Sequence, residues 1–299
     1  LLAALAPIVP GAACTLRSPD GIRLPSLPVS LPDMAVFRTG HFQAQDEAAQ
    51  MIAYLLSPRP NENVLDACAG LGGKTGHLAQ LMAHRGQITA ADIHAGRLAT
   101  LRQEMNRLGV TTVTTLRSDL RSDPGSGGRY DRILLDAPCS GLGVLRRNPD
   151  AKWKPLPGGP ARFARRQLDL MSRLAPRLRP GGVLVYAVCS FEPEENERVV
   201  DASHLTPPEF AHAAAPACGP VSIWEGSLDS RGLQRTIPPR HDTDGIFAAR
   251  LRRSGEQSGP GVTGRDCPER ELFVNANLKA RSQNERWHLS PRRLKMTVS

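Results

Sequence analysis

The stretches LLDAPCSG at 134–141 and LVYAVCSFEPEEN at 184–196 give the strongest indication of this chain's fold. Each begins as an apolar run typical of a buried β-strand and ends in a cysteine followed by serine, at Cys139 and Cys189. Because the carboxyl ends of strands line the ligand crevice of an open α/β sheet, we expect both thiols there, beside Asp136. Two thiols and a carboxylate suit a reaction in which one sulfur adds to a substrate ring and a second group helps to remove it.

Other interpretations of these cysteines stay open at this point. A free cysteine often only fills a core. Six cysteines at irregular spacing over 299 residues do not form the compact framework of a disulfide-stapled secreted domain. The CxxC and Cys/His spacings of metal sites do not occur, so we expect no metal. The acids near both cysteines favour a functional pair.

The rest of the chain alternates strand-like and helix-like segments. The hydrophobic pattern predicts strands at 63–67, 87–92, 112–117, 131–136 and 182–188, and helices at 46–58, 74–84, 95–108 and 162–178. This alternation predicts an α/β fold with a mostly parallel sheet covered by helices on both faces, and 245–251 is expected to add an antiparallel edge strand.

We expect three parts in the chain. Residues 1–39 form an irregular amino-terminal segment, a remnant of a preceding linker or subdomain, which is mostly loop from 17 to 40. The apolar start at 1–14 lacks the basic region of a signal peptide, so we interpret it as the interior of a longer chain. Residues 40–252 form one catalytic domain, and 253–299 form a basic tail expected to be mostly disordered because it loses all periodicity.

The charge of the chain indicates a polyanionic partner. A formal net charge of +9 and an isoelectric point near 9.7 attract nucleic acid or an anionic membrane surface. No apolar run approaches the roughly 18 residues of a membrane span, so we expect a cytoplasmic protein that does not engage a membrane.

A glycine-rich turn lies in LDACAGLGGKTGHLAQL at 65–81, between the first expected strand and its helix. Glycines at 70, 72 and 73 let the backbone approach a ligand and leave helix amides pointing at it. Asp92 ends the next strand, where an acid accepts hydrogen bonds from ribose hydroxyls, and Asp119 follows the third strand, where it can bind an adenine amino group. The set predicts an adenosyl ligand.

Three alternatives compete for the same residues. GLGGKT at 70–75 and RILLD at 132–136 are similar to the phosphate-binding loop and second strand of a P-loop ATPase, although Cys68 stands where that loop needs its first glycine. A dinucleotide site would need the G-x-G-x-x-G spacing, which this turn lacks. A non-catalytic basic RNA-binding module would leave the crevice acids and thiols without a role.

Five stretches together resemble the Sun (Fmu) branch of bacterial RNA cytosine-5 methyltransferases, which act on small-subunit (16S) ribosomal RNA. They are GHFQAQDEAAQ (40–50), LDACAGLGGKTGHLAQL (65–81), ADIHAGRL (91–98), DRILLDAPCSGLGVLRRNPDAKW (131–153) and RPGGVLVYAVCSFEPEENERVV (179–200). The resemblance implies a class I methyltransferase fold and S-adenosylmethionine as the cofactor. It also implies that Cys189 attacks carbon 6 of cytosine, that Cys139 assists release and that Asp136 holds the base.

The cofactor residues implied by the resemblance are Cys68, Ala69, Gly70, Leu71, Gly72, Gly73, Lys74, Asp92, Arg97, Asp119 and Asp136. The sequence departs from the family pattern in three respects. Leu71 replaces a proline of the cofactor loop, and Val188 replaces the threonine before the nucleophile. The family's amino-terminal NusB-like RNA-binding domain does not occur in this chain.

The expected RNA contacts lie between the two cysteine strands, in a basic set that can track phosphates. The set comprises Arg146, Arg147, Lys152, Lys154, Arg162, Arg165 and Arg166. Trp153 and Phe191 are candidate stacking platforms for an unpaired cytosine, and His77, His84 and His94 are expected at the surface. We expect RNA as the only macromolecular partner, with the chain itself a monomer.

Overall fold

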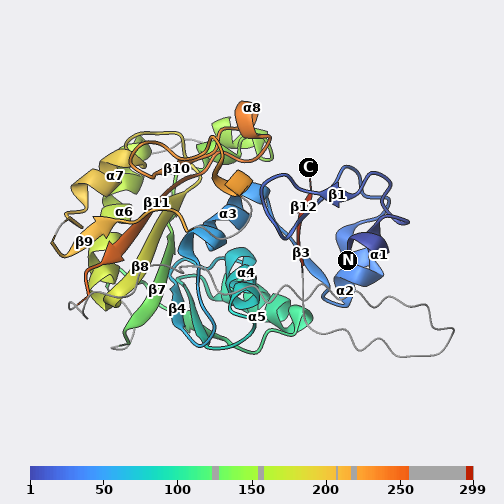
Figure 1. Cartoon of the computed structure of the whole chain (residues 1–299), viewed down its shortest axis with the longest axis horizontal. Helices are drawn as coiled ribbons and strands as arrows, with labels where there is room; N and C mark the ends of the chain where they lie inside the picture. The colour runs from blue at the N-terminus through green and yellow to red at the C-terminus, as the bar shows by residue number, and fades with distance from the viewer. Residues whose placement is uncertain (123–127, 154–157, 207, 217–220, 256–293, 299) are drawn as a thin grey trace.

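A computed structural model describes residues 1–122, 128–153, 158–206, 208–216, 221–255 and 294–298 (Figure 1). Its main sheet has the order β10-β11-β8-β7-β4-β5-β6, with β9 paired to β11. The strands are β4 (Asn63–Asp66), β5 (Gln87–Asp92), β6 (Val113–Arg117), β7 (Tyr130–Asp136), β8 (Leu178–Val188), β9 (Phe210–His212), β10 (Gln234–Arg235) and β11 (Phe247–Arg253). Strands β4 to β8 pair in parallel, while β11 runs antiparallel to β8. The predicted parallel sheet with an antiparallel edge is therefore present.

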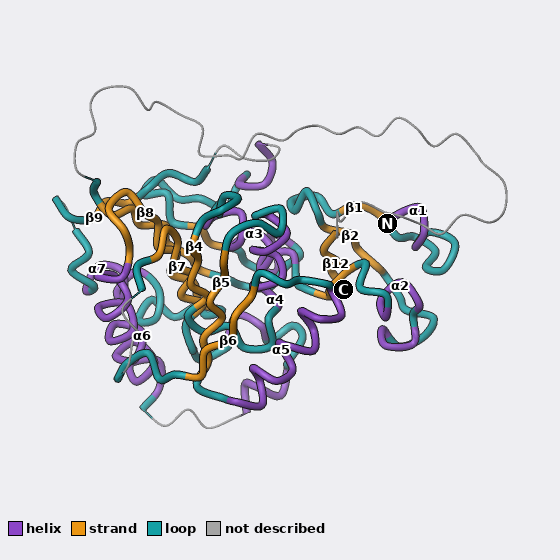
Figure 2. The backbone as a smooth tube through the Cα atoms, turned by 90° about the horizontal axis from the view of Figure 1, so that it is seen from below, coloured by secondary structure: helices purple, strands orange, loops and turns teal. Residues whose placement is uncertain are grey.

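Helices cover both faces of this sheet (Figure 2). One face carries α3 (Glu47–Leu56), α4 (Gly73–Leu81) and α5 (Ala95–Leu108), and the other carries α6 (Gly159–Leu174) and α7 (Glu197–Ala202). Successive strand residues point to opposite faces, so Leu134 packs with α3 to α5 and Leu135 packs with α6 and α7. The central strands are therefore apolar on both sides and contribute to the core under each helix layer, as expected of a parallel sheet with both faces covered.

Local chemistry fixes where the helices begin and end. The Asp46 carboxylate caps α3 by accepting the Ala48 N–H at 2.9 Å. Gly109 ends α5 at a φ of +61°, a left-handed conformation that glycine adopts without strain. Helix α6 ends at Leu174, earlier than expected, because Pro176 follows in the 3-10 turn η4 (Ala175–Arg177).

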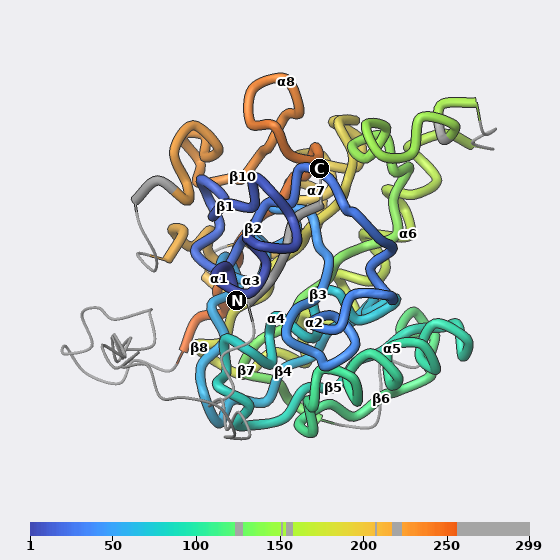
Figure 3. Tube along the Cα trace, turned by 90° about the vertical axis from the view of Figure 1, so that its right-hand side faces the viewer, coloured from blue at the N-terminus to red at the C-terminus, as the bar shows by residue number. Residues whose placement is uncertain are grey.

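The amino-terminal segment is more ordered than its composition suggested. It contributes α1 (Leu2–Leu5), η1 (Leu31–Asp33), α2 (Ala35–Arg38) and two strands of a second, four-stranded sheet with the order β1-β2-β12-β3. The two strands are β1 (Ala13–Cys14) and β2 (Gly21–Leu24). The sheet also contains β3 (Phe42–Ala44), just after the expected boundary, and β12 (Leu294–Val298) from the expected tail. The segment has a small core of its own, including Leu5, Ile22 and Phe42. Figure 3 looks onto it from its outer side.

Arg107 of α5 joins this segment to the main domain. Its guanidinium lies 3.8 Å from the ring centroid of Phe37 and donates to the Phe42 carbonyl at 3.0 Å. The remaining short helices are η2 (Leu142–Val144), η3 (Pro149–Trp153), η5 (Val221–Trp224) and α8 (Pro238–His241). Within the described ranges, no helix is both long and apolar enough to cross a membrane.

Candidate active site

The two cysteines that follow β7 and β8 lie in contact. These strands are parallel neighbours, with Asp136 opposite Ala187 in the register. Because both strands end at the same edge of the sheet, the Sγ atoms of Cys139 and Cys189 come to 3.1 Å from each other. Strand pairing thus brings together two residues that are 50 positions apart in the sequence.

Backbone contacts hold the two cysteine loops together. The Gly143 N–H donates to the Cys189 carbonyl at 2.9 Å, and the Gly245 N–H donates to the Gly143 carbonyl at the same distance. A Cβ atom on Gly143 would lie 2.0 Å from the Gly245 oxygen, so only glycine allows this approach.

The surroundings of the two thiols make them unequal. The hydrogen bond from Cys139 lowers the pKa of Cys189, assisted by the Lys74 charge and opposed by burial and by Asp136. The same hydrogen bond, then burial and the Cys189 charge, raise the pKa of Cys139 well above its ordinary value. The pair therefore favours a thiolate at Cys189 and a protonated donor at Cys139.

Lys74 links the glycine-rich turn to the thiols. Its Nζ lies 2.6 Å from Oδ2 of Asp136. Burial lowers the pKa of Lys74, but the charge and hydrogen bond of Asp136, together with the charges of Cys189 and Asp66, outweigh it, so this pKa lies above its ordinary value. A fixed cation consequently stands beside Asp136 and Cys189, a pairing that the sequence did not indicate because Lys74 and Asp136 are 62 residues apart.

The glycine-rich turn leaves open space at Gly70, whose backbone contacts the buried Asp92. Gly70 has a φ of +55°, and a Cβ atom placed on it would meet nothing within 4 Å. Its N–H donates to Oδ2 of Asp92 at 3.1 Å, while the His94 N–H donates to Oδ1 at 2.8 Å. Each carboxylate oxygen keeps a second lone pair, so Asp92 retains acceptor capacity for ligand hydroxyls. Helix α4 begins directly after Gly72 and directs its first amides to the same place.

Other expected cofactor residues lie at this edge with partners of their own. Arg121 holds both carboxylate oxygens of Asp119, through Nε at 2.9 Å and Nη2 at 2.6 Å, and its hydrogen bonds lower the pKa of that acid. Arg97 Nη1 lies 3.9 Å from Oδ2 of Asp92. Leu71, which stands in the family's proline position, is 59% exposed.

Two groups at the start of the glycine-rich turn have raised pKa values. Burial raises the pKa of Asp66 to about 7, although a 2.7 Å hydrogen bond from Thr75 opposes the shift. Burial, followed by the charges of Asp136 and Asp66, raises the pKa of Cys68 far above its ordinary value. Cys68 therefore stays a thiol and differs chemically from Cys189.

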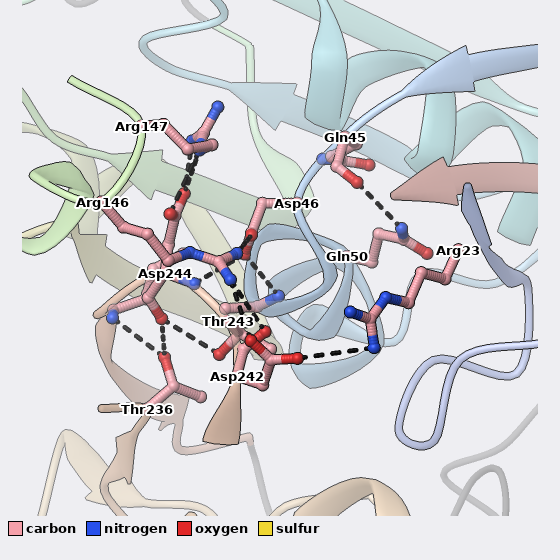
Figure 4. A network of polar contacts seen from close by, with 12 residues as sticks. Arg23, Gln45, Asp46, Gln50, Arg146, Arg147, Thr236, Asp242, Thr243 and Asp244 are labelled. Atoms are coloured by element: carbon pink, nitrogen blue, oxygen red, sulfur yellow. Dashed lines mark hydrogen bonds and ion pairs between the residues drawn. The ribbon is translucent and has the colours of Figure 1, made fainter. Parts of the chain in front are cut away.

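Two of the expected RNA-contacting arginines are engaged in an acidic network (Figure 4). Arg146 lies 3.2 Å from Asp46 and 3.1 Å from Asp242, and Arg147 Nε donates to Asp244 at 2.9 Å. The Asp244 N–H also donates to Asp46 at 3.1 Å, which connects the α3 cap to the loop before β11. Burial and the Asp244 charge raise the pKa of Asp46.

The other members of the basic set are more open. Arg162 and Arg165 are exposed on α6 and Arg166 is partly buried, while Lys152 is exposed and Lys154 lies outside the described residues. Trp153 is 76% exposed, whereas the Phe191 ring fills the space where Gly245 has no side chain.

The expectation for His77 was wrong. The side chain is fully buried, because Asp20 of the amino-terminal segment and Tyr54 of α3 cover it. His84 is partly buried, and His94 is exposed as predicted.

Comparison with known proteins assigns the family. The profile described as "16S rRNA methyltransferase RsmB/F" matches residues 53–252. The chain belongs to this family. Membership in the RsmB/F family confirms the predicted resemblance, and nothing in these comparisons supports the ATPase or the non-catalytic module.

Proteins that are similar in sequence carry names that agree with this family. The chain is 36% identical over 228 residues to "Probable ribosomal RNA small subunit methyltransferase B" of Bacillus subtilis, covering 73% of this chain and 49% of the relative. A protein of the same name from Synechocystis is 36% identical over 241 residues, which cover 79% and 53% of the two chains. The chain thus spans about half the length of the curated relatives it matches.

Solved structures confirm the methyltransferase fold class. "The crystal structure of NSun6 from Pyrococcus horikoshii with SFG" is similar at 33% identity and a TM-score of 0.68, covering 79% of this chain and 58% of that one. "Crystal Structure of PH0851" is similar at 32% identity and a TM-score of 0.71, covering 81% and 54%.

Proposed function

We propose that this chain methylates carbon 5 of a cytosine in small-subunit ribosomal RNA, with Cys189 forming a transient covalent bond to carbon 6 of the base. The observation that carries the proposal is the 3.1 Å contact between the Cys139 and Cys189 sulfurs, together with their opposite pKa shifts. Family membership supports ribosomal RNA methylation, while the cytosine target and the adduct rest on the thiol geometry.

Cytosine needs a nucleophile at carbon 6 because its carbon 5 is otherwise unreactive. The Cys189 thiolate adds to carbon 6 and turns carbon 5 into an enamine-like centre. Asp136 keeps Oδ1 for the N4 amino group of the ring, and for N3 once that nitrogen is protonated as the adduct forms, since Lys74 holds its Oδ2. After transfer the carbon 5 proton passes to solvent, the electrons of that C–H bond restore the ring double bond, and the bond between carbon 6 and sulfur breaks to release Cys189 as a thiolate. The Cys139 thiol, 3.1 Å away, assists this step by donating a hydrogen bond to the departing thiolate.

The glycine-rich turn fits S-adenosylmethionine. When bound, this cofactor supplies the methyl group from its sulfonium centre. Cys68 to Lys74 would line its methionine side, and Asp92 would accept from the ribose hydroxyls with Arg97 nearby. Asp119 would lie at the adenine side, where a ligand amino group must share its carboxylate with Arg121.

One gel with two variants tests the roles of the cysteines. With unmodified ribosomal RNA and labelled S-adenosylmethionine, Cys189→Ala should transfer no methyl group and form no covalent protein–RNA species. Cys139→Ala should still attack and methylate, although more slowly because the hydrogen bond that lowers the Cys189 pKa is lost, and it should release product slowly and accumulate an adduct that survives denaturation. Nuclease digestion of the wild-type product should place the label in 5-methylcytosine. Full activity in both variants without any adduct would refute the thiol mechanism.

A binding measurement tests the cofactor site. Asp92→Ala should weaken S-adenosylhomocysteine binding by about 1 to 3 kcal/mol, because the ribose hydrogen bonds are lost. Asp169→Ala, which removes a surface acid on α6 paired with Arg173, should bind as the wild type does. Calorimetry that showed magnesium-dependent ATP binding and no response to S-adenosylhomocysteine would instead favour the P-loop alternative.

A further inference from the structure

A buried carboxylate lies behind the two thiols, at Glu195. Its side chain is fully shielded from solvent, at 0% exposure, in the loop that follows Cys189. Burying a carboxylate is costly unless its oxygens receive hydrogen bonds. The partners of Glu195 therefore indicate what this residue does.

The two Glu195 oxygens reach different cysteine loops. Oε1 accepts the backbone N–H of Ser140, the residue after Cys139, at 2.9 Å. Oε2 accepts the hydroxyl of Ser190, the residue after Cys189, at 2.7 Å. The hydroxyls of Ser140 and Ser190 are themselves 3.1 Å apart. One carboxylate thus spans the two residues that adjoin the thiols.

Further contacts hold this carboxylate in place. Gln167 of α6 donates to Oε1 at 3.1 Å and also to the carbonyl of Pro138, on the other side of Cys139, at 2.9 Å. The Tyr186 hydroxyl donates to the Glu195 carbonyl at 2.5 Å, and Asn196 donates to the Ser190 carbonyl at 3.2 Å. Glu195 is consequently anchored to the sheet through β8 and to the helix layer through α6.

We propose that Glu195 is a positioning residue, whose carboxylate ties the Cys139 loop to the Cys189 loop and so sets the separation of the two sulfurs. It touches neither base nor cofactor and acts through Ser140 and Ser190. Its significance for methyl transfer rests on the proposed function, whereas its effect on thiol separation does not. The proposal requires the length of the glutamate side chain, because its two carboxylate oxygens must reach both cysteine loops at once.

Two substitutions separate length from charge. Glu195→Asp shortens the side chain by one methylene, about 1.5 Å, so its carboxylate cannot hold both loops. Glu195→Gln keeps the length, and the Ser190 hydroxyl can turn to accept from the new amide. Glu194→Gln is the matched control, since the neighbouring, partly exposed Glu194 pairs with Arg198, four residues later, rather than with either cysteine loop among the described residues.

Thiol separation is measured without RNA, by titration with phenylarsine oxide. The trivalent arsenic forms one bond to each of two adjacent sulfurs, the two thiol protons leave with the arsenical oxygen as water, and no oxidant is needed. Cys139→Ala, which cannot make this two-sulfur ring, gives the background. Glu195→Asp should bind the arsenical about tenfold more weakly, while Glu195→Gln and Glu194→Gln stay within about threefold of the wild type.

Methyl transfer to unmodified ribosomal RNA is measured on the same proteins. The rate of methyl transfer should fall about 10- to 100-fold in Glu195→Asp, while its affinity for S-adenosylhomocysteine stays unchanged. Glu195→Gln should retain most of the wild-type rate. Ser190→Ala removes the Oε2 contact together with the hydroxyl's contacts to Ser140 and Glu192, and it should reduce arsenical binding and rate if Glu195→Asp does not fold. The proposal would be overturned if a folded Glu195→Asp or Ser190→Ala protein bound the arsenical and transferred methyl groups as well as the wild type does. An inactive wild type with the expected arsenical pattern would refute the proposed function alone.

Discussion

Asp66 and Asp136 are carboxylates at the ends of neighbouring strands, yet they have opposite surroundings. Asp136 pairs with the Lys74 ammonium group at 2.6 Å, beside the thiols. Asp66 is almost completely buried, and its described side-chain hydrogen bond comes from the neutral hydroxyl of Thr75. Burial without a bound cation disfavours its ionised form, which is why its pKa rises to about 7.

Asp66→Asn should therefore change how stability depends on pH. The native pKa of about 7 exceeds the ordinary 3.8, so the folded protein holds this proton more tightly than the unfolded chain. The contribution of Asp66 to stability is present below the unfolded pKa and is lost as pH rises through about 7, a loss on the order of 4 kcal/mol.

Asparagine cannot ionise, so the free energy of unfolding of the variant, minus that of the wild type, should increase between about pH 4 and pH 7. Urea denaturation across this range measures the difference. The amide oxygen of the variant still accepts the Thr75 hydroxyl, and the pH dependence of the difference isolates the titration of Asp66. A difference that did not vary with pH would show that Asp66 titrates normally.

At the scale of elements, the candidate site depends on how loops from distant segments fit together. The η2 turn that carries Gly143 lies between the Cys189 loop and Gly245, with hydrogen bonds to each. This close approach leaves no room for a side chain, whereas Gly96 on α5 has open space around its Cα.

Gly143→Ala should destabilise the fold and displace the cysteine loops. Its new methyl group would lie 2.0 Å from the Gly245 oxygen, so backbone must move, at a cost of about 1 to 3 kcal/mol in the free energy of unfolding. Gly96→Ala, the matched control, should gain up to about 1 kcal/mol because alanine favours the helix. Chemical denaturation of both proteins measures the contrast, and equal stabilities would contradict the packing argument.

The elements that could be predicted from sequence are those with a local pattern. Strands such as 131–136 and helices such as 95–108 were predicted because apolar spacing and caps lie within each segment. The pairing of β12 between β2 and β3 could not be predicted, since no local signal in β12 specifies strands so far away in the sequence. Predictions of residue environments failed for the same reason. His77 is covered by Asp20, and Arg147 is paired with Asp244, 97 residues later.

At the scale of the whole molecule, the positive charge is only partly available to a polyanion. Arg146 and Arg147 are compensated by nearby acids, while Arg162 and Arg165 are exposed on α6. We therefore expect the exposed α6 arginines, more than the paired ones, to determine how binding of RNA depends on salt.

The double variant Arg162→Ala/Arg165→Ala should flatten the plot of log affinity against log salt by roughly 1 to 2 units, because fewer phosphates release counterions. Filter binding of ribosomal RNA at several salt concentrations measures this slope. Arg173→Ala, which removes a surface arginine already paired with Asp169, should leave the slope unchanged. An unchanged slope in the double variant would place the RNA path elsewhere.

The hydrogen bond from Asp244 to Asp46 spans 198 residues, and this has a consequence for the order of assembly during synthesis. Strands β4 to β6 lie within 63–117 and can pair soon after they emerge from the ribosome. The cysteine side of the sheet must wait for β8 and for β11, which the chain supplies much later. We therefore expect the growing polypeptide to complete its glycine-rich turn first, and to bring its two reactive sulfurs into register only after β8 and β11 have been synthesised.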